Sequence, residues 1–434
     1  MRARNRDTYY MSVSPQHDVV VVGGGPAGLA AAVCAAESGA HTLLIDNNAR
    51  LGGQIWRAGL DESREDEFAK WQQRVQSAGV SILAGVQVVD HPGPGVLLGE
   101  NAHGPQVIHY GRLVLATGAR ERFLPFPGWT LPNVVGVGGL QALVKTGLPI
   151  RGKRVAIAGA GPLLLAVADH LRKQGADVVL IAEQTSWDTL ATFAIGLLRS
   201  PGKLKQAFAI KKGLAGVPYR TSCWPIGARG ADAVRQVDFH GLFGRFTVDC
   251  DYLACGFHLV PNTELAHLIG CEKLGNFIAV DALQQTSVKN VYCAGEPTGI
   301  GGLEAALYEG QIAGFCAAQN EPKARELFPE RQRHRAFTAR VERTFSLRPE
   351  LRQLCTDDTI VCRCEDVNFA RLRSESNWRS AKLLTRCGMG PCQGRICGPI
   401  TEYLFDWHHE SVRPPVFPST VETMATEIEQ AKES

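Results

Sequence analysis

Five of the 13 cysteines of this chain lie within residues 361–397, near its C-terminal end. Cys362 and Cys364 stand two positions apart after apolar residues, which is typical of a strand whose alternate side chains point the same way. Cys392 and Cys397 flank the sequence QGRI and follow GMGP, a turn whose free amide groups can donate hydrogen bonds to sulfur. Four thiolates from two loops suit either a structural zinc ion or a two-iron cluster.

The spacing of these thiols bears on which metal they would bind. Structural zinc more usually has two Cys-x-x-Cys pairs, and neither pair here has that spacing, so zinc stays the alternative to iron. The odd number of cysteines fits no complete disulfide framework, and the first 16 residues lack the apolar run of a signal peptide. We therefore expect a cytoplasmic protein with reduced thiols. Seven other cysteines stand singly in apolar segments and are interpreted as small core residues: Cys34, Cys223, Cys250, Cys255, Cys271, Cys293 and Cys316.

The N-terminal part contains a glycine motif between two apolar strands. Gly23, Gly25 and Gly28 have the spacing G-x-G-x-x-G after four valines, and an Ala-rich helical segment follows. The first glycine permits the turn, the second lets the backbone approach a pyrophosphate, and the third allows close packing of the helix. Asp46 ends the next apolar strand, where a carboxylate can accept hydrogen bonds from ribose hydroxyls. The combination predicts a dinucleotide site with the phosphates at the start of the helix.

Length and composition limit what these elements can form. A chain of 434 residues suggests roughly three domains, and 45% apolar with 21% charged residues is typical of a soluble globular protein. Residues 19–36 are apolar enough to raise a membrane span, but the glycines and proline at their centre favour a strand, turn and helix. Lys and Arg total 46 against 43 Asp and Glu without a long block of one sign, which argues against a nucleic-acid partner.

Three further segments resemble those of the two-dinucleotide-binding flavoproteins, whose members include the pyridine nucleotide-disulfide reductases. They are LGGQIWR from Leu51, LVLATGARERFLPFPG from Leu113 and NVYCAGEPTGIGGLEAALYEGQIAG from Asn290. The resemblance implies an α/β fold of Rossmann type and FAD as the cofactor, with Glu296 contacting the ribityl chain where an Asp is commoner. The residues that it implies in FAD binding are Gly23, Gly25, Pro26, Ala27, Gly28, Asp46, Gly53, Gln54, Ala116, Thr117, Gly118, Gly295 and Glu296.

A second copy of the glycine motif lies in residues 153–184. Gly159 and Gly161 occupy the first two glycine positions and Glu183 ends the second strand, but Leu164 replaces the third glycine. A leucine there either pushes helix and strand apart or makes the turn open differently. The repeat predicts a second domain of the same architecture. It leaves NAD(P) binding and an empty or otherwise used site as equal alternatives.

The C-terminal cysteine segment resembles the bacterioferritin-associated-ferredoxin-like [2Fe-2S] domain that is appended to certain flavoprotein subunits. The shared pattern is C-x-C followed by T-R-x-G-M-G-P-C-Q-G-x-x-C, which implies Cys362, Cys364, Cys392 and Cys397 as cluster ligands. Cys387 departs from the pattern, since relatives commonly have a small apolar residue there, and is either a bystander or a substitute for Cys392. The dithiol of the disulfide reductases is not expected, because QIWR follows the second glycine pair.

A two-dinucleotide fold that ends in this ferredoxin-like segment resembles the alpha, or A, subunits of heteromeric amino-acid dehydrogenases and oxidases. That group includes proline and hydroxyproline dehydrogenases, octopine and nopaline oxidases and, more distantly, hydrogen cyanide synthase. The resemblance implies an FAD-containing beta subunit that oxidises the substrate C–N bond, with FMN at the interface and a small ferredoxin-like subunit as further options. This chain offers no catalytic base for amine oxidation, so we assign no catalytic residue and expect a flavin and iron–sulfur electron-transfer subunit.

Two alternatives stay open from the sequence. The first is a self-contained NAD(P)H-dependent reductase that passes electrons through FAD to the cluster, although Leu164 counts against it. The second is a redox or iron-sensing binding protein, in which flavin and cluster report a state without turnover.

The same landmarks divide the chain. The expected parts are a disordered leader (1–16), a discontinuous FAD-binding domain (17–125 and 260–325), an NAD(P)-binding-like domain (126–259), an exposed helical connector (326–354) and a cluster domain (355–434). The sequence LPFPGWTLPN is predicted to be a hinge, because its prolines interrupt regular structure. The later sequence VRPPVFPSTVETMATE either docks on a partner subunit or packs within the chain.

Overall fold

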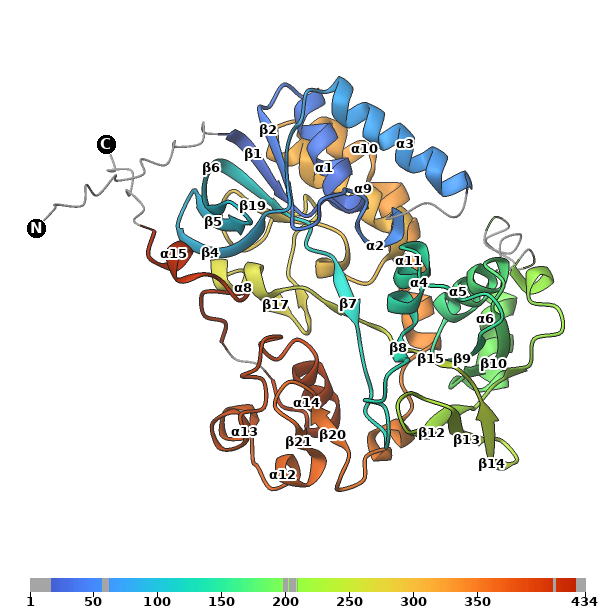
Figure 1. Cartoon of the computed structure of the whole chain (residues 1–434). Helices are drawn as coiled ribbons and strands as arrows, with labels where there is room; N and C mark the ends of the chain where they lie inside the picture. The colour runs from blue at the N-terminus through green and yellow to red at the C-terminus, as the bar shows by residue number, and fades with distance from the viewer. Residues whose placement is uncertain are drawn as a thin grey trace, which may run out of the picture.

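The computed structural model describes residues 17–56, 62–197, 210–408 and 411–426, together with residues 202 and 208. The leader predicted over residues 1–16 lies outside these ranges. The described chain is a mixed α/β structure with two main sheets, one partly and one wholly parallel, each flanked by helices, as Figure 1 shows. Among the described residues, no helix combines the length and the apolar character needed to cross a membrane.

The first sheet has seven strands and lies in the upper part of Figure 1. They are β1 (His17–Val22), β2 (Thr42–Asp46), β3 (Ser81–Ala84), β4 (Gln87–Gly93), β5 (Val96–Asn101), β6 (Gly104–Leu115) and β19 (Val291–Cys293). Strands β3, β2, β1, β6 and β19 are parallel, whereas β4, β5 and the first half of β6 form an antiparallel extension. The four valines of β1 are buried because both faces of the parallel part are covered.

Two helices pack closely against each other beside this sheet. They are α1 (Pro26–Glu37), the predicted Ala-rich helix, and α9 (Gly302–Ala317). A Cβ on Gly310 would overlap the carbonyl oxygen of Ala27, and one on Gly314 would overlap that of Ala31, so the backbones touch because side chains are absent there. The remaining elements of this part are α2 (Gly53–Trp56), α3 (Glu62–Ser77), α8 (Glu264–Ile269), β17 (Lys273–Leu274), β18 (Phe277–Ile278) and η1 (Glu296–Thr298).

The second sheet repeats the same architecture, as the sequence predicts. Its strands are all parallel and have the order β11 (Tyr219–Arg220), β10 (Asp177–Glu183), β9 (Arg154–Gly159), β15 (Tyr252–Gly256) and β8 (Val134–Gly136). Its helices are α4 (Val137–Lys145), α5 (Pro162–Lys173) and α6 (Trp187–Leu197). Leu164 is buried over Gly256, where an added Cβ would lie 3.2 Å from the leucine Cδ2. The leucine is accommodated because position 256 has no side chain.

The segment predicted to be a hinge is irregular and partly buried. It follows β7 (Ala119–Glu121), which pairs with β16 (Leu259–Pro261), and it runs beside the antiparallel strands β12 (Trp224–Arg229), β13 (Gln236–Gly241) and β14 (Gly244–Asp249). Phe126 and Trp129 belong to one hydrophobic core with Val361 and Ile400 of the cysteine segment. The prolines therefore interrupt regular structure as predicted, but the segment packs between two parts of the molecule.

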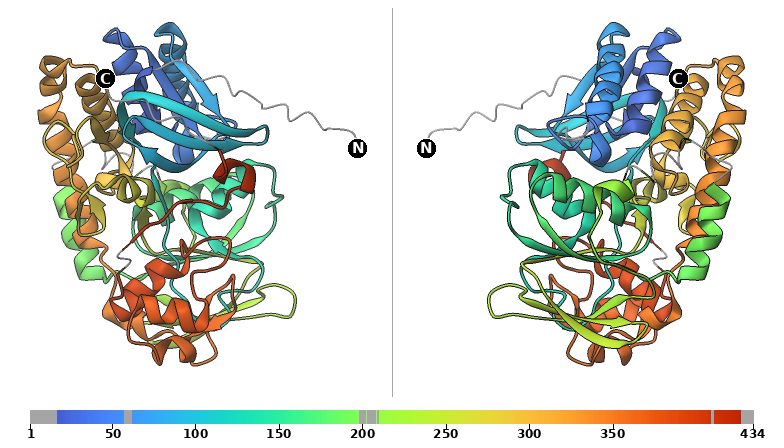
Figure 2. Two further views of the ribbon diagram at one scale, coloured as in Figure 1. Left: turned by 90° about the vertical axis from the view of Figure 1, so that its left-hand side faces the viewer. Right: turned by 90° about the vertical axis from the view of Figure 1, so that its right-hand side faces the viewer.

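The connector and the cysteine segment are mostly helical. Their elements are α10 (Glu321–Glu326), α11 (Phe328–Thr344), η2 (Pro349–Gln353), β20 (Ile360–Cys362), β21 (Val367–Asn368), α12 (Phe369–Arg373), α13 (Trp378–Thr385), α14 (Cys397–Phe405) and α15 (Val421–Met424). Helix α11 lies beside α6 in both views of Figure 2. Its residue Arg331 is buried, so this helix is less exposed than the charged sequence suggests.

The Pro-rich tail returns to the first sheet. The amide of Val416 donates to the carbonyl oxygen of Val89 at 2.8 Å. The amide of Thr420 donates to the carboxylate of Glu100 at 3.0 Å. Figure 2 shows this red segment and α15 against the antiparallel strands. Of the two alternatives for the tail, the structure has packing within the chain.

Candidate flavin and metal sites

The first glycine motif forms the turn between β1 and α1. Gly23 has a φ of 110°, which glycine adopts without strain, and a Cβ there would overlap the carbonyl oxygen of Ala116. A Cβ on Gly28 would overlap the carbonyl oxygen of Gly23. An added Cβ on Gly25, in contrast, has only the Cα of Gly53 within 4 Å, at 3.8 Å. The start of α1 is thus open to a pyrophosphate, and this cradle fits a dinucleotide.

The carboxylate of Asp46 lies at the same turn. It is buried at the end of β2 and accepts a hydrogen bond from the Gly24 amide at 2.5 Å. Its second oxygen accepts from the amide of Asn48 at 2.7 Å and from the Nδ2 of that residue at 2.8 Å. Asp46 therefore joins the glycine turn to the strand end. Its hydrogen bonds to ribose hydroxyls stay a prediction.

The other segments predicted to bind FAD meet around this turn. Gly53 and Gln54 begin α2, and the side chain of Gln54 is exposed. An added Cβ on Gly53 would lie 2.9 Å from the Cα of Gly25, and one on Gly295 would lie 2.9 Å from the Cβ of Ala27. These close approaches place segments far apart in the sequence at the carboxyl end of one parallel sheet, where α/β proteins bind ligands.

Hydrogen bonds with Asn262 hold the loop of residues 116–118 in place. The Oγ1 of Thr117 donates to the carbonyl oxygen of Asn262 at 2.6 Å, and the Nδ2 of Asn262 donates to the carbonyl oxygen of Thr117 at 2.9 Å. Arg120 donates to the Oδ1 of Asn262 at 2.6 Å. Gly118 has a φ of 70°, so glycine allows the chain to turn here.

Glu296 caps the start of α9. Its carboxylate oxygens accept hydrogen bonds from the amides of Gly301 and Gly302, each at 3.1 Å. Burial raises the pKa of Glu296 to about 7, and the two amides oppose this shift. The carboxylate lies beside Gly295, as the flavin segment predicts, but its contact with a ribityl chain stays a prediction.

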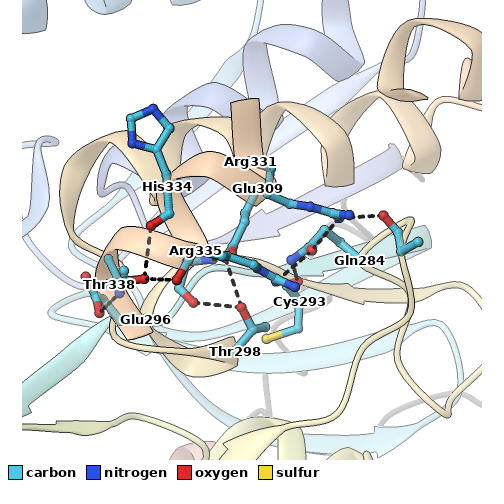
Figure 3. A network of polar contacts seen from close by, with 12 residues as sticks. Gln284, Cys293, Glu296, Thr298, Glu309, Arg331, His334, Arg335 and Thr338 are labelled. Carbon is cyan, nitrogen blue, oxygen red and sulfur yellow. Dashed lines mark hydrogen bonds and ion pairs between the residues drawn. The ribbon is translucent and has the colours of Figure 1, made fainter. Parts of the chain in front are cut away.

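A buried carboxylate that the sequence reasoning missed lies behind this loop. Glu309 of α9 is 3% exposed and accepts hydrogen bonds from the Gly295 amide at 3.0 Å and the Thr298 hydroxyl at 2.9 Å. Arg335 of α11 lies 2.7 Å from its other oxygen, as Figure 3 shows. The sequence carried one signal, because Arg331 and Arg335 are four residues apart and thus share one face of a helix.

The two arginines also hold Gln284. The Oε1 of Gln284 accepts from Arg331 at 3.3 Å and from Arg335 at 3.2 Å. Arg331 also donates to the carbonyl oxygen of Ala282 at 2.6 Å. The fully buried Gln284 in turn donates from its Nε2 to the carbonyl oxygen of Cys293 at 2.9 Å (Figure 3). Helix α11 is thereby joined to the end of β19, directly before the Gly295 turn.

The strand that carries the first cysteine pair is shorter than predicted. β20 ends at Cys362, and Cys364 lies in the following turn, in which Asp366 has a left-handed φ of 48°. Because the turn redirects the chain, Cys362 is buried whereas Cys364 is exposed. The prediction that an extended strand points both thiols in the same direction is therefore wrong.

The thiols nevertheless gather in one place. The sulfur atoms of Cys362, Cys387 and Cys397 lie within 4.8 Å of one another, and this is the largest such group of metal ligands among the described residues. Cys364 and Cys392 form a second pair joined by a hydrogen bond. A tetrahedral zinc ion would need four sulfurs about 3.8 Å apart, given its bond lengths. A group of three thiols beside a separate pair is compatible with a binuclear iron cluster, in which each iron takes two of the sulfurs.

Hydrogen bonds favour the ionised form of the innermost thiol. The thiols of Cys387 and Cys397 donate to Cys362 and lower its pKa, and the amides of Gly388 and Glu365 add to this effect. The Gly388 amide belongs to the glycine-rich turn after Cys387, where the sequence predicts amide donation to sulfur. The same hydrogen bonds to Cys362 raise the pKa of the Cys387 thiol to about 12 and also raise that of Cys397, so a bound metal would have to displace their protons.

Close packing holds the two cysteine loops together. A Cβ on Gly390 would overlap the Cβ of Cys364, so the loops approach this closely only with glycine at that position. Arg386, which ends α13 with a left-handed φ of 68°, donates to the carboxylate of Glu365 at 2.7 Å. These contacts lie beside Cys364, which with Cys392 forms the outer, less buried pair of thiols.

The cysteine segment also touches the predicted flavin segment. The Nε of Arg120 donates to the carbonyl oxygen of Arg395 at 3.1 Å, and Arg395 lies in the loop between Cys392 and Cys397. Arg120 pairs with Glu264 at 2.9 Å as well. Because Arg120 also binds the loop of residues 116–118 through an asparagine, one side chain connects the two candidate sites.

The seven singly placed cysteines are all buried, as predicted. Cys250 and Cys255 have the spacing C-x-x-x-x-C, which the disulfide reductases also use. Both are free thiols in the hydrophobic core, and burial raises the pKa of Cys250 to about 11 and that of Cys255 further. Dithiol exchange needs an accessible thiolate, so this pair is inert.

Two Rossmann-type repeats with an open glycine turn in the first define a two-dinucleotide-fold flavoprotein oxidoreductase. Residues 17–195 match the family model of the pyridine nucleotide-disulphide oxidoreductases. The chain is 31% identical to hydrogen cyanide synthase subunit HcnB of Pseudomonas protegens, over 89% of this chain and 90% of that one. It is 32% identical to the A subunit of opine oxidase from Rhizobium meliloti, over 95% of this chain and 99% of that one.

The chain belongs to the family that contains HcnB of hydrogen cyanide synthase and the A subunit of opine oxidase, and it is a FAD-dependent oxidoreductase. This confirms the resemblance that the sequence motifs indicate. Among solved structures, L-proline dehydrogenase from P. horikoshii is similar in fold, with a TM-score of 0.67 and 17% identity over 95% of this chain and 80% of that one.

Proposed function

We propose that this chain is the flavin and iron–sulfur electron-transfer subunit of a heteromeric dehydrogenase or oxidase that acts on an amino acid or an opine. Two of its relatives are named as subunits, of hydrogen cyanide synthase and of opine oxidase, which supports assembly with a partner. The proposed partner is an FAD-containing beta subunit. An interfacial FMN, a small ferredoxin-like subunit and a cytoplasmic location belong to the same proposal.

The observation that carries this proposal is the contact between the cysteine loop and the loop of residues 116–118. Arg120 binds the carbonyl oxygen of Arg395, which lies between two of the proposed cluster ligands, and it also binds Asn262, the partner of Thr117. Electron transfer between two cofactors depends on how the protein places them relative to each other. A partly buried set of hydrogen bonds between the two loops supports such a placement.

The residues of the chain have separate proposed roles. The amides at Gly25 and at the start of α1 bind the pyrophosphate of FAD, and Asn262 holds the neighbouring loop. The proposed cluster ligands are Cys362 with Cys397 and Cys364 with Cys392. When bound, FAD supplies two-electron chemistry and the cluster supplies one-electron transfer.

Oxidation of the C–N bond is assigned to the partner. Near the predicted flavin site, Glu296 is engaged with two backbone amides and Glu309 with an arginine and the Gly295 amide. A general base must reach the proton that it removes, and these carboxylates serve the structure instead. The chain alone should therefore not turn over an amine.

The first experiment is the cofactor content of the anaerobically purified full chain. We expect one FAD and about two irons per chain, and a paramagnetic signal on reduction. Amine oxidation should be negligible for the chain alone and should require the co-expressed beta subunit. Zinc in place of iron would contradict the cluster, and robust amine turnover by the single chain would contradict the role within a larger enzyme.

A further inference from the structure

The two glycine motifs are similar in sequence but differ at the second glycine, where Gly25 has a φ of −78° and Gly161 has a φ of 97°. The first glycine has a positive φ in both, 110° at Gly23 and 148° at Gly159, and in both a proline begins the helix after the second glycine. No side chain lies within 4 Å of a Cβ added to Gly25, and the only atom in that range is the Cα of Gly53, at 3.8 Å. An added Cβ on Gly161 would instead lie 3.7–4.0 Å from three atoms of the Phe345 side chain.

The Phe345 side chain therefore packs close to the second glycine of this motif, where a dinucleotide fold binds the pyrophosphate. The second glycine of this motif exists so that the phosphate groups can approach the backbone, and a phenyl ring there presents neither charge nor a hydrogen-bond acceptor. The ring is buried directly after α11. On its other side it meets Phe193 of α6 edge-on, with ring centroids 5.4 Å apart and an interplanar angle of 73°.

The backbone after this ring is held at the ends of the parallel strands. The Nε2–H of His258 donates to the carbonyl oxygen of Phe345 at 2.6 Å. Gln184, fully buried just beyond β10, donates from its Nε2 to the carbonyl oxygen of Ser346 at 3.1 Å and accepts at its Oε1 from the Arg348 amide at 3.1 Å. Residues 345–348 thus make the polar contacts at the strand ends, where a dinucleotide binds in this fold.

The same segment leads into the part that carries the cysteines. The hydroxyl of Tyr403 donates to the carbonyl oxygen of Arg348 at 2.9 Å, and Tyr403 lies on α14, the helix that begins at Cys397. Leu351, a few residues on, is buried in the core shared with Cys362. The crevice of the second repeat is therefore connected to the cysteine loops through one short stretch of chain.

We propose that residues 345–348 occupy the crevice that a nicotinamide dinucleotide would take in the second repeat. This repeat binds no NAD(P)H and instead seats the segment that positions the cysteine loops. The inference depends only on the second repeat, and it holds whatever amine or partner the complete enzyme uses.

Titration of the flavin-loaded full chain with NADH and with NADPH in a calorimeter tests the claim that the second repeat binds no NAD(P)H. We expect no saturable binding by either dinucleotide and no bleaching of the flavin on rapid mixing. Stoichiometric binding of either one would overturn the proposal, whether or not the flavin became reduced.

The variant Phe345→Ala tests the claim that residues 345–348 are seated in the second repeat. Losing the ring should loosen the connector, so that limited proteolysis within residues 326–354 becomes faster by on the order of tenfold. Phe337→Ala is the matched control, because Phe337 lies on the same helix and its ring also faces Phe193, at 6.5 Å. Equal cleavage rates in the two variants would overturn the seating of this segment at Gly161.

A measurement on the unaltered protein keeps the proposal testable if a variant fails to fold. The Arg348 amide donates to the buried side chain of Gln184, so its hydrogen exchange should be slow and should not change when NADH is added. Fast exchange of this amide, with slow exchange in the neighbouring strand β10, would show that the crevice is not filled.

Discussion

The Nε of Arg335 lies 2.7 Å from the Oε1 of Glu309 and so joins the connector helix α11 to the helix that begins at the predicted flavin site. Because the other oxygen of Glu309 accepts from the Gly295 amide, the flavin-side turn depends on a residue of the connector. The same helix ends directly before Phe345, which packs against Gly161 of the second repeat. One helix therefore links the two glycine turns and the cysteine segment.

Replacing Arg335 by alanine should destabilise the protein and weaken FAD retention. The change leaves Glu309 buried without its cation, and we expect the free energy of unfolding to fall by about 1–3 kcal/mol. This is less than for a fully buried pair, because the Arg335 side chain is 40% exposed. Arg333→Ala is the control, since Arg333 lies on the same helix with its side chain 74% exposed. Urea unfolding measures the stability of the two variants, and flavin release measures their FAD retention. Equal effects of Arg335→Ala and Arg333→Ala would contradict the prediction.

Glu296 should make stability depend on pH. Burial raises its pKa from 4.5 to about 7, so the folded state holds this proton more tightly than the unfolded chain does. The stability that Glu296 contributes is complete below its unfolded pKa and is lost as the pH rises through about 7. Relative to Glu296→Gln, the wild type should lose roughly 1–3 kcal/mol between about pH 5 and 8. Thermal unfolding of the flavin-free chain measures this, and parallel pH curves for the two proteins would refute it.

Replacing Gly390 by alanine should separate the two cysteine loops. The new Cβ would overlap the Cβ of Cys364, and overpacking of this kind costs about 1–3 kcal/mol. We expect the iron content of the anaerobically purified variant to fall with it. Gly93→Ala is the control, because nothing lies within 4 Å of an added Cβ there. Full iron content in the Gly390 variant would show that the loops need not approach so closely.

The cysteine pairs predict which thiols are essential for the proposed cluster. Cys392→Ser should lose the iron and the paramagnetic signal, because Cys387 lies beside Cys362 and Cys397 and so cannot take the place of a thiol in the outer pair. Cys387→Ser should keep about two irons per chain. Iron analysis and electron paramagnetic resonance distinguish these outcomes. A cluster that survives in Cys392→Ser would mean that Cys387 does substitute for Cys392.

Removing the side chain of Arg120 should slow electron transfer without removing a cofactor. Arg120→Ala deletes the hydrogen bonds to Asn262 and Arg395, so the cysteine loop is no longer fixed against the loop of residues 116–118. We expect the rate from reduced flavin to cluster to fall on the order of tenfold, as small misplacements do. Arg229→Ala, which removes a surface ion pair with Asp238, should leave the rate unchanged. Freeze-quench paramagnetic resonance measures the rate, and an unchanged value in Arg120→Ala would contradict the proposed route.

Local patterns were sufficient for much of the fold. The spacing of Gly23, Gly25 and Gly28 between apolar segments predicted the strand, turn and helix of the first repeat, because only glycine tolerates the positive φ and the close backbone approach found there. The same reasoning found the second repeat despite Leu164. Sequence alone also located the five thiols, since clustered cysteines in a reduced protein indicate a metal site.

Contacts between distant segments decided the rest. The strand period predicted that Cys362 and Cys364 point the same way, but the strand ends at Cys362 and Cys364 already lies in the turn of residues 363–366. Which thiol stands next to which depends on how two loops approach at Gly390, and no local pattern contains that distance. The spacing of Arg331 and Arg335 indicates a shared helix face, but only the tertiary structure shows that Arg335 reaches the buried carboxylate of Glu309.

The sequence by itself therefore determined that the chain has two dinucleotide-type repeats and a cysteine segment, because these features depend on residue type and short spacing. Only the tertiary structure decided that no side chain lies within 4 Å of a Cβ added to Gly25, whereas the Phe345 side chain lies 3.7–4.0 Å from one added to Gly161. Gly161 and Phe345 are far apart in the sequence, and both turns have nearly the same local motif. Whether a turn is free for a ligand depends on what the rest of the chain packs against it.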